Sequence, residues 1–276
     1  MFPQVHQRLN RSAAIRALAA VLNRLSMPVK KVPVSVRGHR MTAHTLDRFL
    51  ALWLWKTGRL ERAGLDLVRE RVRDGMCVAD IGANVGVYTL ELARCTGPRG
   101  AVWAFEPDPG NAAVLEQNVS RNKYSSVQVV RAAVADNDGH ATLYRDEAHH
   151  GDHGIFASTE RRDSIEVAKT CLDSFFRERR SPRFIKLDVQ GAEGLVVRGM
   201  RGLLEPGNPL MLLFELSGTD PVAANTSASD TLGELDHHTF TFSVLSEEDG
   251  ELQPATRSEI LVMLDRAPYV NVLAER

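Results

Sequence analysis

One stretch of the chain, VADIGANVGVYTL at residues 78–90, constrains the fold more than any other. An apolar segment ends in an acid, Asp80, and two glycines, Gly82 and Gly86, then precede apolar residues at helical spacing. Glycine readily adopts positive φ and leaves no side chain between backbone and ligand, so N–H groups at a helix start can approach a polar molecule. Asn84 adds a short polar side chain. The stretch predicts a strand, a nucleotide-binding turn and a helix.

A second acid at the end of a strand strengthens this interpretation. The segment AVWAF at residues 101–105 reads as a strand and is followed by Glu106, about 20 residues after Gly86. In nucleotide-binding βαβ units an acid at this spacing binds the ribose hydroxyls. For the glycine loop alone, an ordinary strand-to-helix turn remains the alternative.

The loop lacks the G-x-G-x-x-G pattern of dinucleotide sites, because Asn84 replaces the middle glycine and bulky residues such as Tyr88 follow it. A ligand without phosphate fits better. S-adenosylmethionine has an adenosine that Glu106 could hold and a methionine end that the glycine loop and Asp80 could meet. The pattern therefore favours methyl transfer over hydride transfer.

Composition excludes several other classes. The 276 residues are 43% hydrophobic and 25% charged, and no apolar run approaches the roughly 18 residues that a membrane span needs. The eight Lys and Arg residues before Asp47 meet no acid, whereas the remainder carries 26 basic and 35 acidic residues. We therefore expect no nucleic-acid partner. Three widely spaced cysteines predict no disulfide framework and favour the cytoplasm.

Residues 1–57 read as an N-terminal helical arm and residues 58–276 as the methyltransferase domain. In the arm, Ser12 could cap an amphipathic helix that carries Leu18, Leu22 and Leu25 on one face. A linker is expected at residues 27–38. The helix could serve as a lid, as a homodimer contact or as a contact with an anionic membrane, and simple packing on the domain is the alternative.

Strand and helix patterns alternate through the rest of the chain, which predicts a mainly parallel sheet with helices on both faces. The binding crevice should lie at the carboxyl ends of the strands. Later alternation predicts an antiparallel edge. The expected strands are residues 76–79, 101–105, 127–130, 184–187 and 210–216, a short extra strand at 141–144, and candidates at 240–244, 260–264 and 269–273.

Several motifs in order resemble those of the FkbM-type S-adenosylmethionine-dependent methyltransferases: VADIGANVGVYTL, FEPDPGNAAVLEQN, VVRAAVADNDG, CLDSF and FIKLDVQGAEGLVVRGM. The resemblance implies an α/β fold, the Rossmann-like class I methyltransferase sheet of seven strands with an antiparallel last strand. It also implies O-methylation of a hydroxyl, often on a sugar or a polyketide-type natural product. Gln190 stands where the family commonly has Glu, which counts against a two-carboxylate metal site there.

The resemblance assigns the cofactor contacts by position. Glu106 would bind the ribose diol, Ala133 would flank adenine, and Tyr88 would either cover the cofactor or pack the first helix. Asp188, at the end of the fourth strand, would also lie beside the cofactor. The methionine end would be lined by Asp80, Gly82, Asn84 and Gly86.

Asp188 is the first catalytic candidate, because a hydroxyl acceptor needs a base for its proton. It could accept that proton, orient the hydroxyl, or only cap the helix that Gly191 and Glu193 open. Glu193, in the first helical turn, is expected to have a supporting role.

Other candidates lie in a His-rich loop and on the fifth strand. His153 could be a base, and His149 and His150 could contact the acceptor or, with His153, bind a divalent metal. Exposed histidines in a polar loop are the alternative. Glu215 could hold the acceptor or a metal, or form a salt bridge.

These patterns predict a cytoplasmic O-methyltransferase that uses S-adenosylmethionine to methylate a hydroxyl of a small molecule or glycoside. The alternatives are N- or carboxyl-methylation of a peptide or amine, and a nucleotide-binding module without chemistry. The sequence leaves the metal requirement open.

Overall fold

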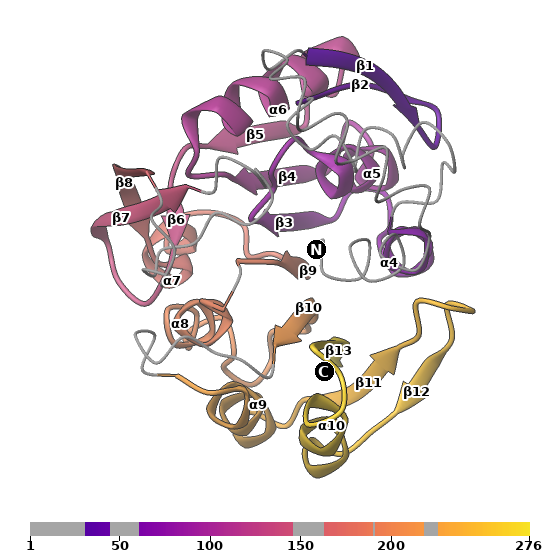
Figure 1. The fold of residues 1–276 in the computed structure, drawn as a ribbon, viewed down its shortest axis with the longest axis vertical. Helices are drawn as coiled ribbons and strands as arrows, with labels where there is room; N and C mark the ends of the chain where they lie inside the picture. The colour runs from indigo at the N-terminus through magenta and orange to yellow at the C-terminus, as the bar shows by residue number, and fades with distance from the viewer. Residues whose placement is uncertain (1–30, 45–60, 146–162, 190, 218–225) are drawn as a thin grey trace, which may run out of the picture.

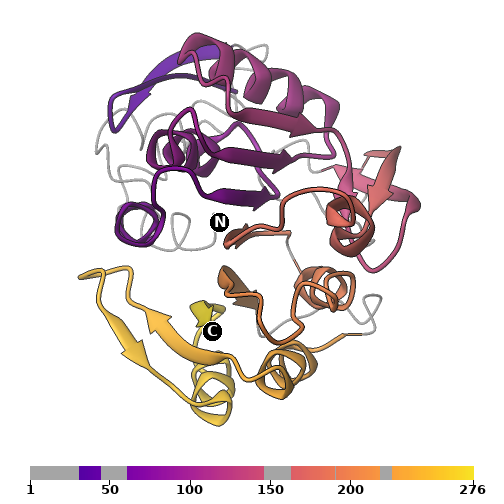
Figure 2. The same cartoon turned by 180° about the vertical axis from the view of Figure 1, so that it is seen from behind.

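The computed structural model describes residues 31–44, 61–145, 163–189, 191–217 and 226–276. An eight-stranded sheet runs through them (Figures 1 and 2). From one edge to the other, its strands are β12 (Leu252–Pro254), β11 (Thr241–Leu245), β13 (Tyr269–Glu275), β10 (Met211–Ser217), β9 (Phe184–Leu187), β3 (Cys77–Ile81), β4 (Ala101–Phe105) and β5 (Val127–Val130).

The sheet confirms the predicted Rossmann-like class. Strands β5, β4, β3, β9 and β10 are parallel neighbours, and β13 inserts antiparallel between β10 and β11. The eighth strand, β12, lies beyond the seven that the resemblance implies. It pairs antiparallel with β11 after a turn at Asp249 and Gly250, where Gly250 has a φ of 81°.

Helices cover both faces of the sheet. One face packs against α4 (Arg62–Arg71), α5 (Val87–Thr96) and α6 (Pro109–Arg121). The other packs against α7 (Leu172–Phe176), α8 (Glu193–Arg198), α9 (Ala228–His237) and α10 (Arg257–Leu264). At the start of α6, Asp108 accepts hydrogen bonds from the N–H groups of Gly110 and Asn111, with Pro109 in the first position, as predicted.

The strand expected at residues 260–264 is wrong, because these residues lie in α10. The signal for the helix is its capping box. Thr256 accepts from the N–H of Glu259, and the Glu259 carboxylate accepts from the N–H of Thr256. A short apolar run alone does not separate a buried strand from a helix.

The prediction of a linker at residues 27–38 is also wrong from Lys31 onward. Residues there form β1 (Lys31–Val36), which pairs antiparallel with β2 (His39–His44) across a turn with positive φ at Arg37 and Gly38. Val36 and Met41 of this hairpin are buried in the main core. Proline cannot donate a backbone hydrogen bond. Pro33 is tolerated because β1 is an edge strand of a two-stranded sheet. The rest of the arm, including the predicted amphipathic helix, lies outside the described residues.

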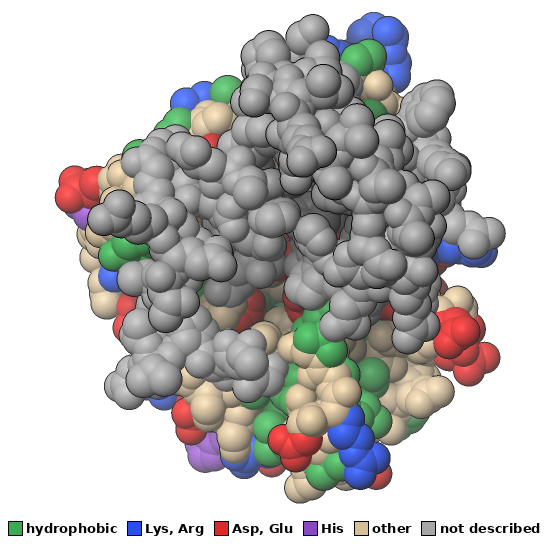
Figure 3. Space-filling view, viewed as in Figure 1, with side chains coloured by type: hydrophobic (Ala, Val, Ile, Leu, Met, Phe, Trp, Pro, Cys, Tyr) green, Lys and Arg blue, Asp and Glu red, His purple; other side chains and the backbone are tan. Residues whose placement is uncertain are grey.

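A separate three-stranded sheet contains β6 (Ala133–Val134), β8 (Asp163–Thr170) and β7 (Gly139–Arg145), in that order. Strand β7 confirms the extra strand expected at residues 141–144. No described helix has the length and apolar character that crossing a membrane would require. On the face shown in Figure 3, the described Lys and Arg side chains lie apart around the rim. The absence of a nucleic-acid partner stays a prediction.

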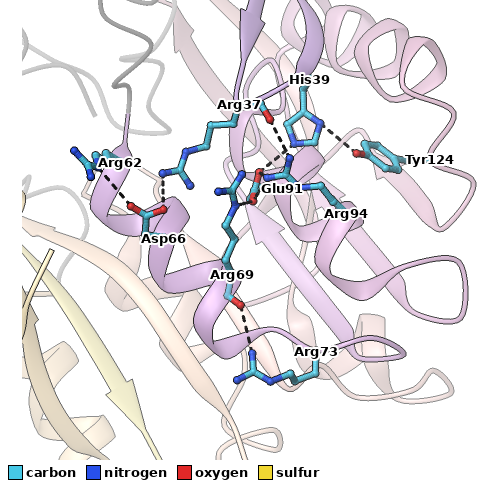
Figure 4. A network of polar contacts seen from close by, with 9 residues as sticks. All are labelled: Arg37, His39, Arg62, Asp66, Arg69, Arg73, Glu91, Arg94 and Tyr124. Atoms are coloured by element: carbon cyan, nitrogen blue, oxygen red, sulfur yellow. Dashed lines mark hydrogen bonds and ion pairs between the residues drawn. The ribbon is translucent and has the colours of Figure 1, made fainter.

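The β1–β2 hairpin is held to the domain by a buried carboxylate, Glu91 of α5 (Figure 4). Glu91 accepts hydrogen bonds from Arg69 of α4, from Arg94 one turn later, and from His39 Nε2 of the hairpin at 3.1 Å. Tyr124 bonds the other ring nitrogen of His39 at 3.2 Å. Burial would raise the pKa of Glu91, but the hydrogen bonds from His39, Arg94 and Arg69 outweigh it and hold the pKa at about 2.

We expect Glu91→Gln to lower the free energy of unfolding at pH 7 by about 2 kcal/mol, since Arg69 and Arg94 remain partly open to water. The folded pKa lies below the ordinary 4.5, so this stability is present above pH 4.5 and is lost as pH falls toward 2. Urea titrations between pH 3 and 7 measure both effects. Glu116→Gln, which breaks an exposed pair with Arg131, is the control. Equal losses in the two variants would contradict the role of Glu91.

Candidate active site

The loop between β3 and α5 curls over the end of β4. The N–H groups of Gly82 and Ala83 donate to the carbonyl of Phe105 at 3.0 and 2.9 Å. Positive φ occurs at Gly82 (78°), Asn84 (50°) and Gly86 (97°). At Gly82, a Cβ would lie 1.9 Å from the carbonyl oxygen of Asp188. The glycine loop and the end of β9 are therefore in direct backbone contact.

Glu106 lies at the end of β4 and is 4% exposed. Its two carboxylate oxygens accept from the N–H groups of Asn84 at 2.8 Å and Asp108 at 2.9 Å. Burial nevertheless raises its pKa to about 7. The structure thus brings Glu106 to the glycine loop, as the predicted cofactor site requires.

Asp80 is buried in β3, where it accepts a hydrogen bond from Thr89 Oγ1 at 2.5 Å. Burial raises the pKa of Asp80 to about 6. Ala133 is buried in the small sheet beside Leu143 and Val167. Asn84 Oδ1 is buried and has no hydrogen-bond partner among the described residues.

A second polar group lies at the carboxyl ends of β9 and β10. Lys186 is 4% exposed, and its Nζ lies 3.6 Å from Asp188 Oδ2. The Asp188 side chain is 13% exposed. Burial would lower the pKa of Lys186, but the carboxylates of Asp188, Glu61, Glu215 and Asp80 raise it. Lys186 is therefore a buried ammonium ion in acidic surroundings.

Tyr88 is directed toward the start of α4. Its hydroxyl donates to Glu61 Oε2 at 2.7 Å, and its ring packs where Gly64 leaves room, since a Cβ there would lie 2.0 Å from the hydroxyl oxygen. The Lys186 ammonium lies 5.1 Å from the ring centroid. This position agrees with the packing alternative, and cofactor contact by Tyr88 stays a prediction.

Glu193 shapes the loop after β9. Its Oε1 accepts from the N–H groups of Val189 and Gly191, both at 3.3 Å, and burial raises its pKa to about 7. This agrees with the supporting role expected from its position.

Gln190, His149, His150 and His153 lie outside the described residues. Within the described part of the chain, no group of three or more His, Cys, Asp or Glu side chains could hold a metal ion.

Sequence reasoning missed Lys186 and Glu61. Lys186 carries a detectable signal, because it is the charged residue in the buried strand FIKL, two positions before a strand-end acid and so on the same face. Glu61 lies directly before α4, where no local pattern marks it.

The sequence matches the Methyltransferase FkbM domain over residues 80–242. The chain belongs to the FkbM methyltransferase family. Membership confirms the predicted enzyme class and the predicted cofactor, S-adenosylmethionine. The matched region contains Asp80 and Glu106 beside the glycine loop. It also contains Lys186, Asp188 and Glu215.

Two curated relatives are similar to parts of the chain. A probable cobalt-precorrin-6B C(15)-methyltransferase (decarboxylating) of Sulfurisphaera tokodaii is 33% identical over 66 residues, which is 24% of this chain and 34% of that protein. The hexuronic acid methyltransferase AglP of Haloferax volcanii is 25% identical over 189 residues, 68% of this chain and 74% of that protein. Among solved structures, M. jannaschii TYW2 in complex with AdoMet has a TM-score of 0.48 at 12% identity, covering 90% of this chain and 87% of that one.

Proposed function

We propose that the protein transfers the methyl group of S-adenosylmethionine to a hydroxyl oxygen of a sugar, glycoside or polyketide-type small molecule. The observation that carries this proposal is the partly open Asp188 at the end of β9, held beside Lys186 and in backbone contact with the glycine loop. The similarity to a protein named as a hexuronic acid methyltransferase supports a glycosyl acceptor.

The residues present fit the cofactor. Asn84 Oδ1, a buried oxygen without a donor among the described residues, could accept from the ammonium group of the methionine moiety. Gly82 and Gly86 would line the same end with Asp80. Glu106, oriented by two backbone N–H groups, would accept from the ribose hydroxyls. Ala133 would flank adenine.

The bound cofactor supplies a methyl group on a positively charged sulfur, and that charge disappears as the bond from carbon to the acceptor oxygen forms and the carbon–sulfur bond breaks. The chain must hold the acceptor oxygen in line with the methyl carbon. Asp188 accepts the hydroxyl proton as the oxygen attacks. The Lys186 ammonium, 3.6 Å from Asp188 Oδ2, forms an ion pair that orients this carboxylate.

Glu106→Gln should weaken S-adenosylhomocysteine binding by about 10-fold to 100-fold, because an amide replaces the charged acceptor for two hydroxyls. The pKa of Glu106 is about 7, and the ribose hydroxyls favour its ionised form, so wild-type affinity should fall as pH decreases from 8 to 6. Calorimetry at several pH values measures both effects. Glu116→Gln on α6 is the control, and unchanged affinity in Glu106→Gln would contradict the ribose assignment.

The proposed function is tested by incubating the full chain with labelled S-adenosylmethionine and a panel of sugars, glycosides, phenols, amines and peptides. We expect label in an ether methyl group on oxygen, identified by mass spectrometry. Transfer to amines or carboxyl groups alone would overturn the proposal in favour of N- or carboxyl-methylation. Tight cofactor binding without transfer to any probe would instead favour a binding module.

A further inference from the structure

Two asparagines at the end of α6 hold one edge of the β1–β2 hairpin, which lies beside that helix (Figure 1). Asn118 lies in the last turn of α6 and Asn122 at its C-cap, four residues on and so on the same face. Asn122 Oδ1 accepts from the N–H of Arg40 at 3.0 Å, and its Nδ2 donates to the Arg40 carbonyl at 2.9 Å. Asn118 repeats this pattern on Thr42, at 2.7 and 3.0 Å. The two amides therefore bind the backbone of β2 much as a neighbouring strand would.

Asn118 makes a further contact, to the glycine loop. Its Nδ2 also donates to the carbonyl of Val85 at 2.8 Å. The Asn118 side chain is fully buried, and its two N–H donors and its oxygen are all engaged. The two bonds to Thr42 fix the plane of the amide, and that plane directs the remaining donor at Val85. One side chain thus joins the hairpin, α6 and the glycine loop.

The peptide unit between Val85 and Gly86 is held at both ends. Its carbonyl accepts from Asn118, and its N–H donates to the carbonyl of Ala83 at 2.9 Å. The residues on either side of Val85, Asn84 and Gly86, both have positive φ, and glycine has several other conformations open to it. Loss of the Asn118 donor would leave a buried carbonyl unpaired, which is costly. The loop could relieve that cost by rotating this peptide unit.

We propose that Asn118, oriented by the β1–β2 hairpin, is a positioning residue for the cofactor site. The path to the cofactor is short: Asn84 directly precedes Val85, and its N–H donates to Glu106 Oε2 at 2.8 Å. A rotated loop would move this donor and, with it, the carboxylate proposed to bind the ribose. The inference rests on the proposed function, because it takes the glycine loop and Glu106 as the cofactor site. The hairpin precedes the matched residues 80–242, so family membership alone does not assign this role.

The test makes one substitution at two matched positions of the full chain, Asn118→Asp and Asn122→Asp. Each variant keeps an acceptor for an N–H of β2 and loses its amide donors, but only Asn118→Asp removes the bond to Val85. Calorimetry with S-adenosylhomocysteine gives the Kd and the number of sites per chain. We expect Asn118→Asp to raise the Kd about 10-fold with the number of sites unchanged, and Asn122→Asp to change the Kd by less than about twofold.

A merely structural role for Asn118 would lower the number of sites per chain and leave the Kd unchanged, and that result would overturn the inference. Equal losses of affinity in the two variants would also contradict it, because docking of the hairpin, rather than the bond to Val85, would then control the site. If Asn118→Asp does not fold, Asn118→Ala and Asn122→Ala repeat the comparison without a buried charge. Wild-type protein that does not bind S-adenosylhomocysteine would instead refute the proposed function.

Discussion

Asp188→Asn should reduce kcat for methyl transfer to a hydroxyl by about 100-fold or more, the usual contribution of a positioned base. Asparagine keeps the shape of the side chain but cannot take the proton that the hydroxyl must lose. The affinity for S-adenosylhomocysteine should change little, because the backbone contact between residue 188 and Gly82 does not depend on the side chain. Single-turnover kinetics and calorimetry separate the two quantities.

The pH profile distinguishes a base from an orienting group at this position. In the wild-type protein, the rate should fall at low pH as Asp188 is protonated, and this limb should vanish in Asp188→Asn. Asp236→Asn, at the exposed end of α9, is the matched control and should retain the wild-type profile. Near-normal turnover of a hydroxyl acceptor by Asp188→Asn would mean that the proton goes elsewhere.

Gly82→Ala should lower the free energy of unfolding by about 4 kcal/mol, or prevent folding at 37 °C, because two penalties coincide. Gly82 has a φ of 78°, which an alanine rarely adopts. Its Cβ would also lie 1.9 Å from the carbonyl oxygen of Asp188, and backbone on both sides cannot turn away as a side chain could. Thermal and chemical denaturation measure the loss.

Gly250→Ala separates these two penalties. Gly250 has a nearly equal φ of 81°, but a Cβ there would meet no atom within 4 Å. This control should cost about 1 kcal/mol, the conformational part alone. A similar loss in both variants would show that the contact between the glycine loop and β9 is not tight in solution.

The sequence predicts the centre of the fold well because the signals there are local. The apolar run at residues 184–187 predicts β9 at its observed bounds, and Asp108 with Pro109 predicts the start of α6. The errors occur where a local pattern fits two structures. Residues 31–36 combine a proline with alternating apolar residues, and residues 260–264 form a short apolar run whose helical state depends on the cap at Thr256.

The meeting of the glycine loop with Glu106 is also foreseen, since Gly82, Asn84 and Glu106 belong to one βαβ unit with fixed spacing. Asp188 and Glu215 are candidates from the sequence, whereas Glu61, which also lies near Lys186, is not, because it comes from a segment distant in sequence. Glu61 reaches Lys186 only after α4 has packed against the sheet. The same holds for Glu91, whose partner His39 is 52 residues away. Tertiary contacts of this kind leave no periodic trace in the chain.

The pairing of β3 with β9 bears on how the chain is made. Val78 of β3 pairs with Phe184 of β9, so the inner edge of β3 has no strand beside it until about a hundred more residues have been synthesised. During that interval β3 and β4 can already pair. The other edge of β3 (Cys77–Ile81) still exposes unpaired backbone N–H and C=O groups to other chains. Aggregation during translation should therefore be most frequent before β9 leaves the ribosome, and slower elongation ahead of that point would lengthen the exposure.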